Sequence, residues 1–420
     1  MKTFPRSALT ISVAALLAAA LLAGCSGSQP PISAPGVMPQ TNISARSYKL
    51  LYRFHTLTGA HPRASLIEVN GTLYGTTEYG GTHKKGTVYS VSPSGAEKVL
   101  YSFAGADGAN PRAGLVDLDG ILYGTTVNGG AGSCGASLGG CGVVYNITTG
   151  GTEKVLHVFT GSPDGANPEA SLIDFNGTLY GSTDLGGSGC ASCGTVFSIG
   201  PSGKEKILHS FTGNSDGYMP QASLIAVKGT LYGTTIWGGP GCYPTGCGTI
   251  YSISPRGAEK VLYSFMGGSD GENASSGLVS VKGLLYGTTT GGGGTSCDFN
   301  IGCGTVYSVT TDGREKVLYS FTGGADGEYP DAGLIDVNGT LYGTTSYGGG
   351  SSCGAGCGTI YSVSTTGVEM VLHDFVRASD GLEPEAALLE VNGALYGTTE
   401  TGGSGCRRLN HCGTVFTLSP

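Results

Sequence analysis

The sequence predicts an all-β fold, a seven-bladed propeller of four-stranded antiparallel blades, and three observations lead to this fold class. A Leu-Tyr-Gly motif recurs seven times after residue 46, at intervals of 49 to 57 residues. Each interval contains four short β-like segments, and the strand that is missing from the last repeat is present before the first one. Repeats of this length with four strands each are typical of propeller blades.

The composition is compatible with such a loop-rich β protein. Gly and Pro contribute 77 and 18 of the 420 residues, but 39% of the chain is apolar and only 12% is charged. A disordered chain has the opposite balance, so this one can bury a core. The formal charge of −8 excludes the basic footprint that nucleic-acid binding requires, and no nucleic-acid partner is expected.

Residues 1–24 are expected to be a lipoprotein signal peptide. Lys2 and Arg6 precede an apolar run that ends in Leu-Ala-Gly-Cys at residues 22–25, and this order is typical of a secretory signal. The last four residues resemble the lipobox of bacterial lipoproteins, which implies cleavage before Cys25 and attachment of lipid to its sulfur. Several acyl chains would hold the protein at a membrane. A plain secretory signal with an incidental cysteine is the alternative.

Residues 25–45 are expected to comprise the lipidated cysteine and a flexible stalk. The segment is rich in Ser, Pro, Gln and Gly and lacks apolar periodicity. The expected location is therefore the cell envelope, outside the cytoplasm. In a Gram-negative host, Ser26 directly after the cysteine would favour the outer membrane.

The propeller is expected to span residues 46–420, and its first repeat has strands at 66–69, 72–77, 86–91 and 97–103. An Asn-Gly pair joins the first two, because a two-residue hairpin turn needs the positive φ that these residues tolerate. The last repeat stops after its third strand, at 413–418, whereas 48–54 is a fourth strand without a blade. If the N-terminal strand completes the last blade, the ring closes. An open β-solenoid, the rival fold, has no use for that exchange.

Twelve of the 13 cysteines form six local pairs, each between a Gly-Gly and the third strand of a repeat. The pairs are Cys134/Cys141, Cys190/Cys193, Cys242/Cys247, Cys297/Cys303, Cys353/Cys357 and Cys406/Cys412. In an exported protein, an even set at equivalent positions predicts disulfides. Zinc would require two pairs to converge, which pairs on different blades cannot do, so neither a metal site nor a cofactor is expected.

The full repeat unit resembles that of the GloVer tandem-repeat proteins, a family of surface-anchored bacterial proteins. Its strings are Leu-Tyr-Gly-Thr-Thr, Gly-Gly, Gly-Thr-Val-Tyr-Ser-Val and Glu-Lys-Val-Leu-Tyr-Ser-Phe, followed by Asp-Gly. A looser similarity to the kelch repeat lies in the hairpin that ends in Gly-Gly. The resemblance covers residues 46–420 and implies the propeller fold and the surface location, and it brings no biochemical activity with it.

Candidate ligand-binding residues lie on the face where the loops vary in length and carry the cysteines, since loops on a rigid scaffold usually hold binding sites. Residues just before the first strand differ from blade to blade while their neighbours repeat: His61, Arg63, Arg112, Glu169, Gln221, Asp331 and Glu385. Aromatic residues occupy one equivalent position before Gly-Gly: Tyr79, Trp237 and Tyr347. A solvated rim and aromatic cover over a loop are the alternatives. His157, His209 and His373, which replace a fourth-strand tyrosine, are interpreted as structural.

The leading functional hypothesis is a lipid-anchored binding or interaction scaffold outside the cytoplasm, with a carbohydrate or protein ligand. The membrane is the expected partner of the lipid anchor. The sequence contains neither a Gly-x-Ser-x-Gly elbow nor a His-Glu-x-x-His or phosphate-loop motif, so no catalytic residues are assigned and an enzyme is not favoured. The alternatives are a polysaccharide hydrolase or lyase with its site at the channel mouth, and a purely structural surface protein.

Overall fold

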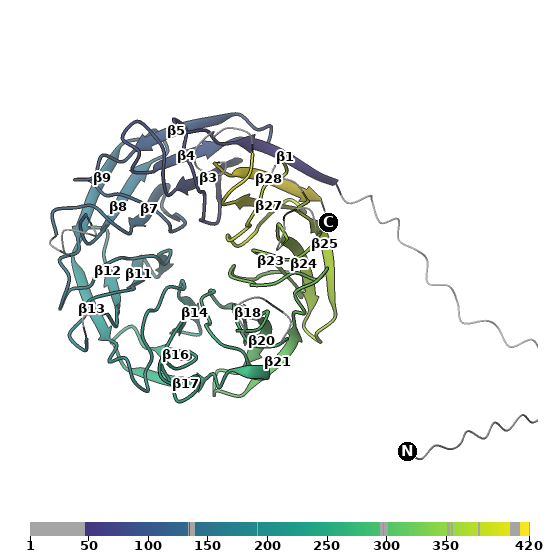
Figure 1. Ribbon diagram of the computed structural model, residues 1–420. Helices are drawn as coiled ribbons and strands as arrows, with labels where there is room; N and C mark the ends of the chain where they lie inside the picture. Colours follow the sequence, from purple (N-terminus) through teal and green to yellow (C-terminus); the bar gives the residue numbers. More distant parts are fainter. Residues whose placement is uncertain are drawn as a thin grey trace, which may run out of the picture. The chain divides into compact units, whose positions relative to one another are not determined.

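The computed structural model describes residues 47–132, 134, 139–190, 192–294, 297, 301–350, 353, 356–376, 379–403 and 412–419. The predicted signal peptide, Cys25 and the stalk lie outside these residues. The described strands form seven four-stranded antiparallel sheets, which follow one another around a central axis (Figure 1). The predicted seven-bladed propeller is therefore confirmed.

Each blade runs from an inner strand beside the axis to an outer strand at the rim, and the blades are numbered 1 to 7 in the chain order of their inner strands. The inner strands are β2 (Ile67–Val69), β6 (Val116–Leu118), β10 (Ile173–Phe175), β14 (Ile225–Val227), β18 (Val279–Val281), β22 (Ile335–Val337) and β26 (Leu389–Val391). The second strands are β3 (Thr72–Thr77), β7 (Ile121–Thr126), β11 (Thr178–Thr183), β15 (Thr230–Thr235), β19 (Leu284–Thr289), β23 (Thr340–Thr345) and β27 (Ala394–Thr399). The third strands are β4 (Thr87–Val91), β8 (Val143–Thr148), β12 (Thr195–Ile199), β16 (Thr249–Ile253), β20 (Thr305–Val309), β24 (Thr359–Ser364) and β28 (Thr414–Ser419). The outer strands are β1 (Ser47–Arg53), β5 (Glu97–Ser102), β9 (Glu153–Val158), β13 (Glu205–Ser210), β17 (Glu259–Ser264), β21 (Glu315–Ser320) and β25 (Glu369–Asp374), and a short 3-10 turn, η1 (Gly268–Asp270), follows β17.

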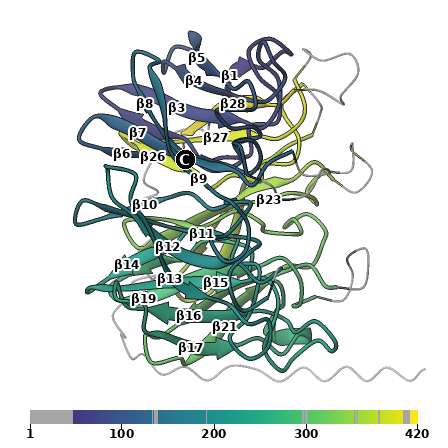
Figure 2. The ribbon, with the colours of Figure 1, turned by 90° about the vertical axis from the view of Figure 1, so that its left-hand side faces the viewer.

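The N-terminal strand closes the ring. β1 pairs with β28 from Ser47↔Ser419 to Arg53↔Thr414, so the last sheet has the order β1-β28-β27-β26. The two ends of the propeller therefore share one blade, as the orphan fourth strand predicts. Figure 2 views the ring from its edge and shows strands from neighbouring blades stacked along the rim.

A buried belt of aromatic rings joins the blades. A phenylalanine that follows each outer strand packs edge-on against a third-strand ring of the next blade, with centroids 4.8 Å apart for Phe54–Tyr89 and 5.5 Å apart for Phe375–Phe416. The third-strand ring also explains the glycine of Leu-Tyr-Gly, because a Cβ at Gly75 would lie 2.6 Å from Tyr89 Oη. The same geometry recurs around the circle, which gives a continuous core between the sheets.

The described loops contain five of the six predicted disulfides. Bonds link Cys134–Cys141, Cys190–Cys193, Cys242–Cys247, Cys297–Cys303 and Cys353–Cys357. The sixth predicted pair includes Cys406, which lies outside the described residues. Disulfides of this number belong to an oxidising compartment, so the protein is extracytoplasmic. Within the described part of the chain, no helix has the length and apolar character needed to cross a bilayer.

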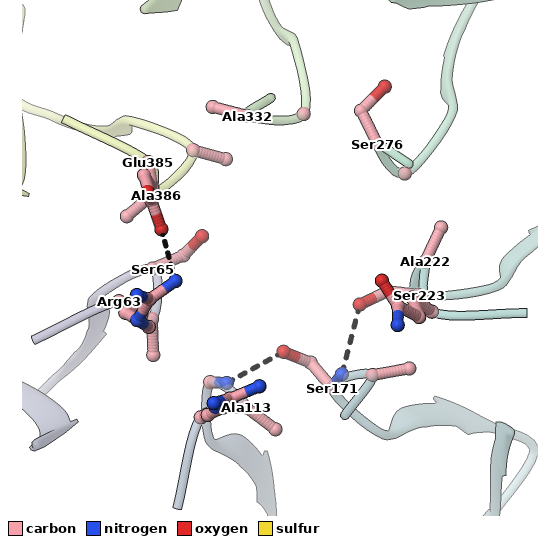
Figure 3. A pocket seen from close by; sticks show the side chains of 18 of the residues that line it. Arg63, Ser65, Ala113, Ser171, Ala222, Ser223, Ser276, Ala332, Glu385 and Ala386 are labelled. Carbon is pink, nitrogen blue, oxygen red and sulfur yellow. Dashed lines mark hydrogen bonds and ion pairs between the residues drawn. The ribbon is translucent and has the colours of Figure 1, made fainter. Parts of the chain in front are cut away.

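Small residues let the inner strands crowd around the axis. The Gly114 N–H donates to Ser171 Oγ at 2.7 Å, and the Ser171 N–H donates to Ser223 Oγ at 3.1 Å (Figure 3). A Cβ at Gly114 would lie 3.0 Å from the same Ser171 hydroxyl, so a larger side chain would disturb this contact. These small residues line a space of about 370 Å³ along the channel, which also reaches the residues of the loop face.

Candidate ligand-binding site at the channel mouth

Seven residues, one from each blade, line a recess of about 370 Å³ at the channel mouth. They are Arg63, Arg112, Glu169, Gln221, Ser275, Asp331 and Glu385. Figure 3 shows the contact between Arg63 and Glu385 beside the small residues Ser65 and Ala386. Six of the seven belong to the predicted set. Sequence reasoning missed Ser275 because a serine does not stand out in a repeat that is rich in small residues.

A strained backbone turn positions each lining residue. The residue two positions earlier has a left-handed conformation in every blade, with φ between 55° and 59°. These residues are His61, Asn110, Asn167, Met219, Asn273, Tyr329 and Glu383. The backbone of His61 is held on both sides, because its N–H donates to the Cys412 carbonyl at 3.1 Å and its carbonyl accepts from Glu78 N–H at 3.0 Å. Such φ values cost energy in non-glycine residues, so these hydrogen bonds impose them.

Two arginines on adjacent blades share one buried carboxylate. Glu78, whose side chain is 2% exposed, lies 3.0 Å from Arg63 Nε and 2.9 Å from Arg112 Nη2. Arg63 also contacts Glu385 at 2.6 Å and Glu400 at 2.5 Å, and Arg112 contacts Glu169 at 2.8 Å. Acids and arginines therefore alternate in one network over blades 7, 1, 2 and 3. This network holds both guanidinium groups in fixed orientations.

Three carboxyl groups of the mouth, Glu78, Asp184 and Glu400, are absent from the sequence prediction. Each directly follows the Thr-Thr or Ser-Thr that ends the second strand, a position that also varies between blades. Strand pairing continues past the named strands through isolated bridges such as Ala60↔Tyr79, and this extension directs the residue toward the mouth. The variability of this position between blades could have identified these three acids. It was overlooked because the position looked like the start of a loop.

The predicted His61 lies beside the network and does not line the recess. Its Nδ1 is 2.8 Å from Glu400 Oε1. Burial opposes the ionisation of Glu400, but hydrogen bonds and positive charge from His61 and Arg63 outweigh it and lower the pKa of Glu400. Burial, together with the neighbouring Glu400 charge, raises the pKa of Glu385. Adjacent Glu385 and Glu400 thus favour a state in which the pair holds a single proton.

Two further acids of the mouth, Asp184 and Asp331, are held by different partners. Burial, with the nearby Glu169 charge, raises the pKa of Asp184 to about 7, and Asp184 Oδ1 accepts from Gln221 Nε2 at 3.1 Å. Burial also raises the pKa of Asp331, whose two oxygens accept from Thr290 Oγ1 at 2.7 Å and Ser346 Oγ at 2.8 Å. Asp331 is therefore occupied by the protein itself, whereas Gln221 and Ser275 form an uncharged side of the recess.

The three predicted aromatic residues lie on blades 1, 4 and 6 of the loop face, and the structure does not bring them together. Tyr79 is 39% exposed and stands edge-on to His61, with centroids 5.4 Å apart. Tyr347 is half-buried and edge-on to Tyr329 at 6.0 Å. Trp237 is half-buried and pairs through its backbone with Tyr218. Tyr79 is the most accessible of the three and adjoins the charged network.

Other polar groups that the repeat pattern points to have local structural partners. At the far end of the inner strands, Asp174 and Asp336 accept from the turn amides of Gly177 and Gly339 at 2.9 and 2.8 Å. A cluster of Cys242, Cys247 and Glu272 has a spacing compatible with a metal ion, but its two sulfurs are joined in a disulfide. A disulfide sulfur is not the thiolate that zinc binds.

A comparison with solved structures finds chains that match this one at low sequence identity. A putative 6-phosphogluconolactonase from Bacteroides uniformis is 14% identical over 75% of this chain and 85% of its own, with a TM-score of 0.48. The endosialidase of phage phi92 is 10% identical over 89% and 68%, and an ulvan lyase is 10% identical over 86% and 94%, each with a TM-score of 0.46. A search of curated proteins finds no match.

The fold and the mouth define a seven-bladed propeller with a polar, blade-variable recess on its loop face. Within this class the repeats themselves identify the family. A model of the Gloeobacter/Verrucomicrobia repeat matches residues 33–138, 135–357 and 300–420. The chain belongs to the Gloeobacter/Verrucomicrobia repeat family.

Proposed function

We propose that the protein is a lipid-anchored, extracytoplasmic binding module whose channel-mouth recess binds a carbohydrate. One observation carries the proposal: the positions that differ between otherwise repeated blades converge on a single recess of about 370 Å³. Pockets for small ligands begin at about 300 Å³, so the recess suits a short segment of a glycan.

The chemistry of the lining supports a polyhydroxylated ligand. A sugar hydroxyl both donates and accepts, and it needs fixed partners of both kinds. Arg63 and Arg112 are 32% and 34% exposed and offer donors, while Glu169 and Gln221 offer acceptors. The acids that surround the two arginines cancel their charge, which disfavours a strongly anionic ligand. Tyr79 adds an exposed ring on which a sugar face can stack.

Anchoring rests on the lipobox-like residues 22–25 and on the stalk expected at residues 25–45. A domain tethered by several acyl chains stays at the membrane surface, where long glycans are available. The outer membrane is the proposed site if the host is Gram-negative. Mass spectrometry of the purified protein tests this, since a diacylated N-terminal Cys25 supports the anchor and an unmodified thiol contradicts it.

The binding test uses the full-length protein with its disulfides intact and a panel of bacterial and plant polysaccharides. We expect retention on at least one glycan, and a loss of at least tenfold in affinity for Arg112→Gln and for Tyr79→Ala. Glu390→Gln, at the far end of the channel, is the matched control and retains wild-type binding. Equal binding by wild type and Arg112→Gln, or no retention on any glycan, contradicts the carbohydrate proposal and favours a protein ligand.

A hydrolase or lyase is the second candidate, and the raised pKa of Glu385 beside Glu400 in the recess favours it. A carboxylic acid that stays neutral near pH 7 beside an ionised neighbour is a suitable general acid. The same panel is assayed for new reducing ends or unsaturated products. Product that disappears in Glu385→Gln while binding persists would establish the enzyme, and absence of product from every bound glycan would dismiss it.

A further inference from the structure

A second chemically distinct cluster lies at the outer rim, away from the channel mouth, between blades 2 and 3. His157 belongs to β9, Asp164 to the loop that leaves this blade, and Glu205 begins β13 of the next blade. One ligand atom from each, the imidazole nitrogen and two carboxylate oxygens, lies within 4.8 Å of the other two. All three side chains are partly accessible, so a solute can reach them.

The repeats show what this position does when it has no histidine. On other blades a tyrosine occupies the place of His157, and its hydroxyl donates to the loop aspartate, at 2.5 Å for Tyr101–Asp107 and 2.8 Å for Tyr319–Asp326. A phenol therefore satisfies the structural need of the repeat. The imidazole of His157 replaces it with a stronger metal ligand and keeps both carboxylates beside it.

We propose that His157, Asp164 and Glu205 form a binding site for one divalent zinc-type cation. His157 Nε2 and Asp164 Oδ1 are 3.3 Å apart, which is longer than a typical charge-assisted hydrogen bond. Ligands about 2.0–2.1 Å from a tetrahedral Zn²⁺ lie about 3.4 Å from each other, so this pair matches one edge of the coordination shell. Three protein ligands leave the fourth position for water.

The surroundings of the three ligands fit this role. Asp164 Oδ2 accepts from the N–H of Thr160 at 2.8 Å and from its hydroxyl at 3.1 Å, which orients the carboxylate and leaves Oδ1 with His157 Nε2 at 3.3 Å as its one hydrogen-bond partner among the described residues. Glu205 Oε1 is covered and has no hydrogen-bond partner among the described residues, a state that it shares with the same oxygen of the other outer-strand glutamates Glu97, Glu153, Glu259, Glu315 and Glu369. A cation would pair with Glu205 Oε1 and offset the repulsion between the two carboxylates.

The neighbouring interface provides a natural comparison. It has the same residue types in His209, Asp216 and Glu259, and His209 Nε2 lies 3.4 Å from Asp216 Oδ2. Asp216 Oδ2 already accepts from the Thr212 N–H at 3.0 Å, and Asp216 Oδ1 accepts from the Thr212 hydroxyl at 2.5 Å. Both oxygens of Asp216 are therefore engaged, and we expect no comparable affinity there.

The test titrates Zn²⁺ into chelator-treated, disulfide-intact, full-length protein that carries no histidine tag. We expect one equivalent to bind in wild type and in His209→Tyr, and at least a tenfold loss of affinity in His157→Tyr and Glu205→Gln. Both tyrosine variants restore the residue that other blades use, so they retain the fold. Zn²⁺ should also raise the Tm of wild type and not that of His157→Tyr.

Three outcomes overturn the site. The first is that wild type, at about 1 μM, binds less than one equivalent of Zn²⁺ when Zn²⁺ is in 100-fold excess. The second is that His157→Tyr binds Zn²⁺ as well as wild type does. The third is that His157→Tyr and His209→Tyr lose the same affinity. The site is independent of the proposed carbohydrate recess. Glycan binding by metal-free protein therefore leaves this result unchanged, and the two proposals fail separately.

Discussion

The aromatic belt and the channel mouth follow opposite rules within one repeat. In the belt, equivalent positions carry nearly the same ring on every blade, from Phe54–Tyr89 to Phe375–Phe416. At the mouth, equivalent positions carry arginine, acid, amide or hydroxyl. Packing between identical blades requires the same shape seven times, whereas recognition of one asymmetric ligand requires seven different contacts. The difference separates residues that hold the ring together from residues that act on something else.

The largest effect is expected in the belt. Phe321 is fully buried and meets Tyr361 with centroids 5.0 Å apart, so Phe321→Ala leaves a cavity between blades. Truncation of a buried phenylalanine costs about 3–5 kcal/mol of unfolding free energy. Urea unfolding measures it, with Tyr79→Ala at the mouth as the control, for which a change within about 1 kcal/mol is expected. A loss below that level in Phe321→Ala would contradict the role of the belt.

An intermediate effect is expected where the mouth depends on its own network. Glu78→Gln removes the buried charge that lies between Arg63 and Arg112 and leaves two partly exposed guanidinium groups without the carboxylate that they share. Loss of one partner in a buried polar network costs about 1–3 kcal/mol. We expect this variant to lose both stability and glycan retention, as measured by urea unfolding and by affinity electrophoresis. If Glu78→Gln retains glycan binding and its stability is unchanged, the network is only a solvated rim of the channel.

Sequence reasoning predicts the fold more completely than the site, for a physical reason. The fold follows from the period of the sequence repeat. The fourth strand that the last repeat lacks is present before the first repeat, which already implies that the ring of blades closes. The mouth depends on contacts that closure creates, since Arg63 meets Glu385 and Glu400 from 322 and 337 residues away. Variability between blades identifies Arg63 and Glu385, but their pairing depends on side-chain direction, which no repeat pattern contains. Glu78 was missed for a local reason, since its position after the second strand looked like the first residue of a loop.

The smallest effect is expected from a change of pH. It tests whether the equivalent glutamates at the contacts between neighbouring blades contribute together to the stability of the propeller. Burial raises the pKa of the glutamate that begins five of the outer strands to about 7: Glu153, Glu205, Glu259, Glu315 and Glu369. In the unfolded chain these groups titrate near 4.5, so between about pH 4.5 and 7 the folded protein binds more protons. Its stability therefore falls as the pH rises through this window.

Two histidines act against this trend. Burial lowers the pKa of His209 and of His373, so each favours the unfolded state as the pH falls below 6.5. Five glutamates outnumber them, and a Tm a few degrees higher at pH 5.5 than at pH 8 is expected by calorimetry. The glutamates are half-exposed, which limits the contribution of each. Glu153→Gln should flatten the dependence and His209→Tyr should steepen it. A Tm that rises with pH in wild type would show that the interfaces hold these glutamates ionised, and the belt alone would then account for the cohesion of the blades.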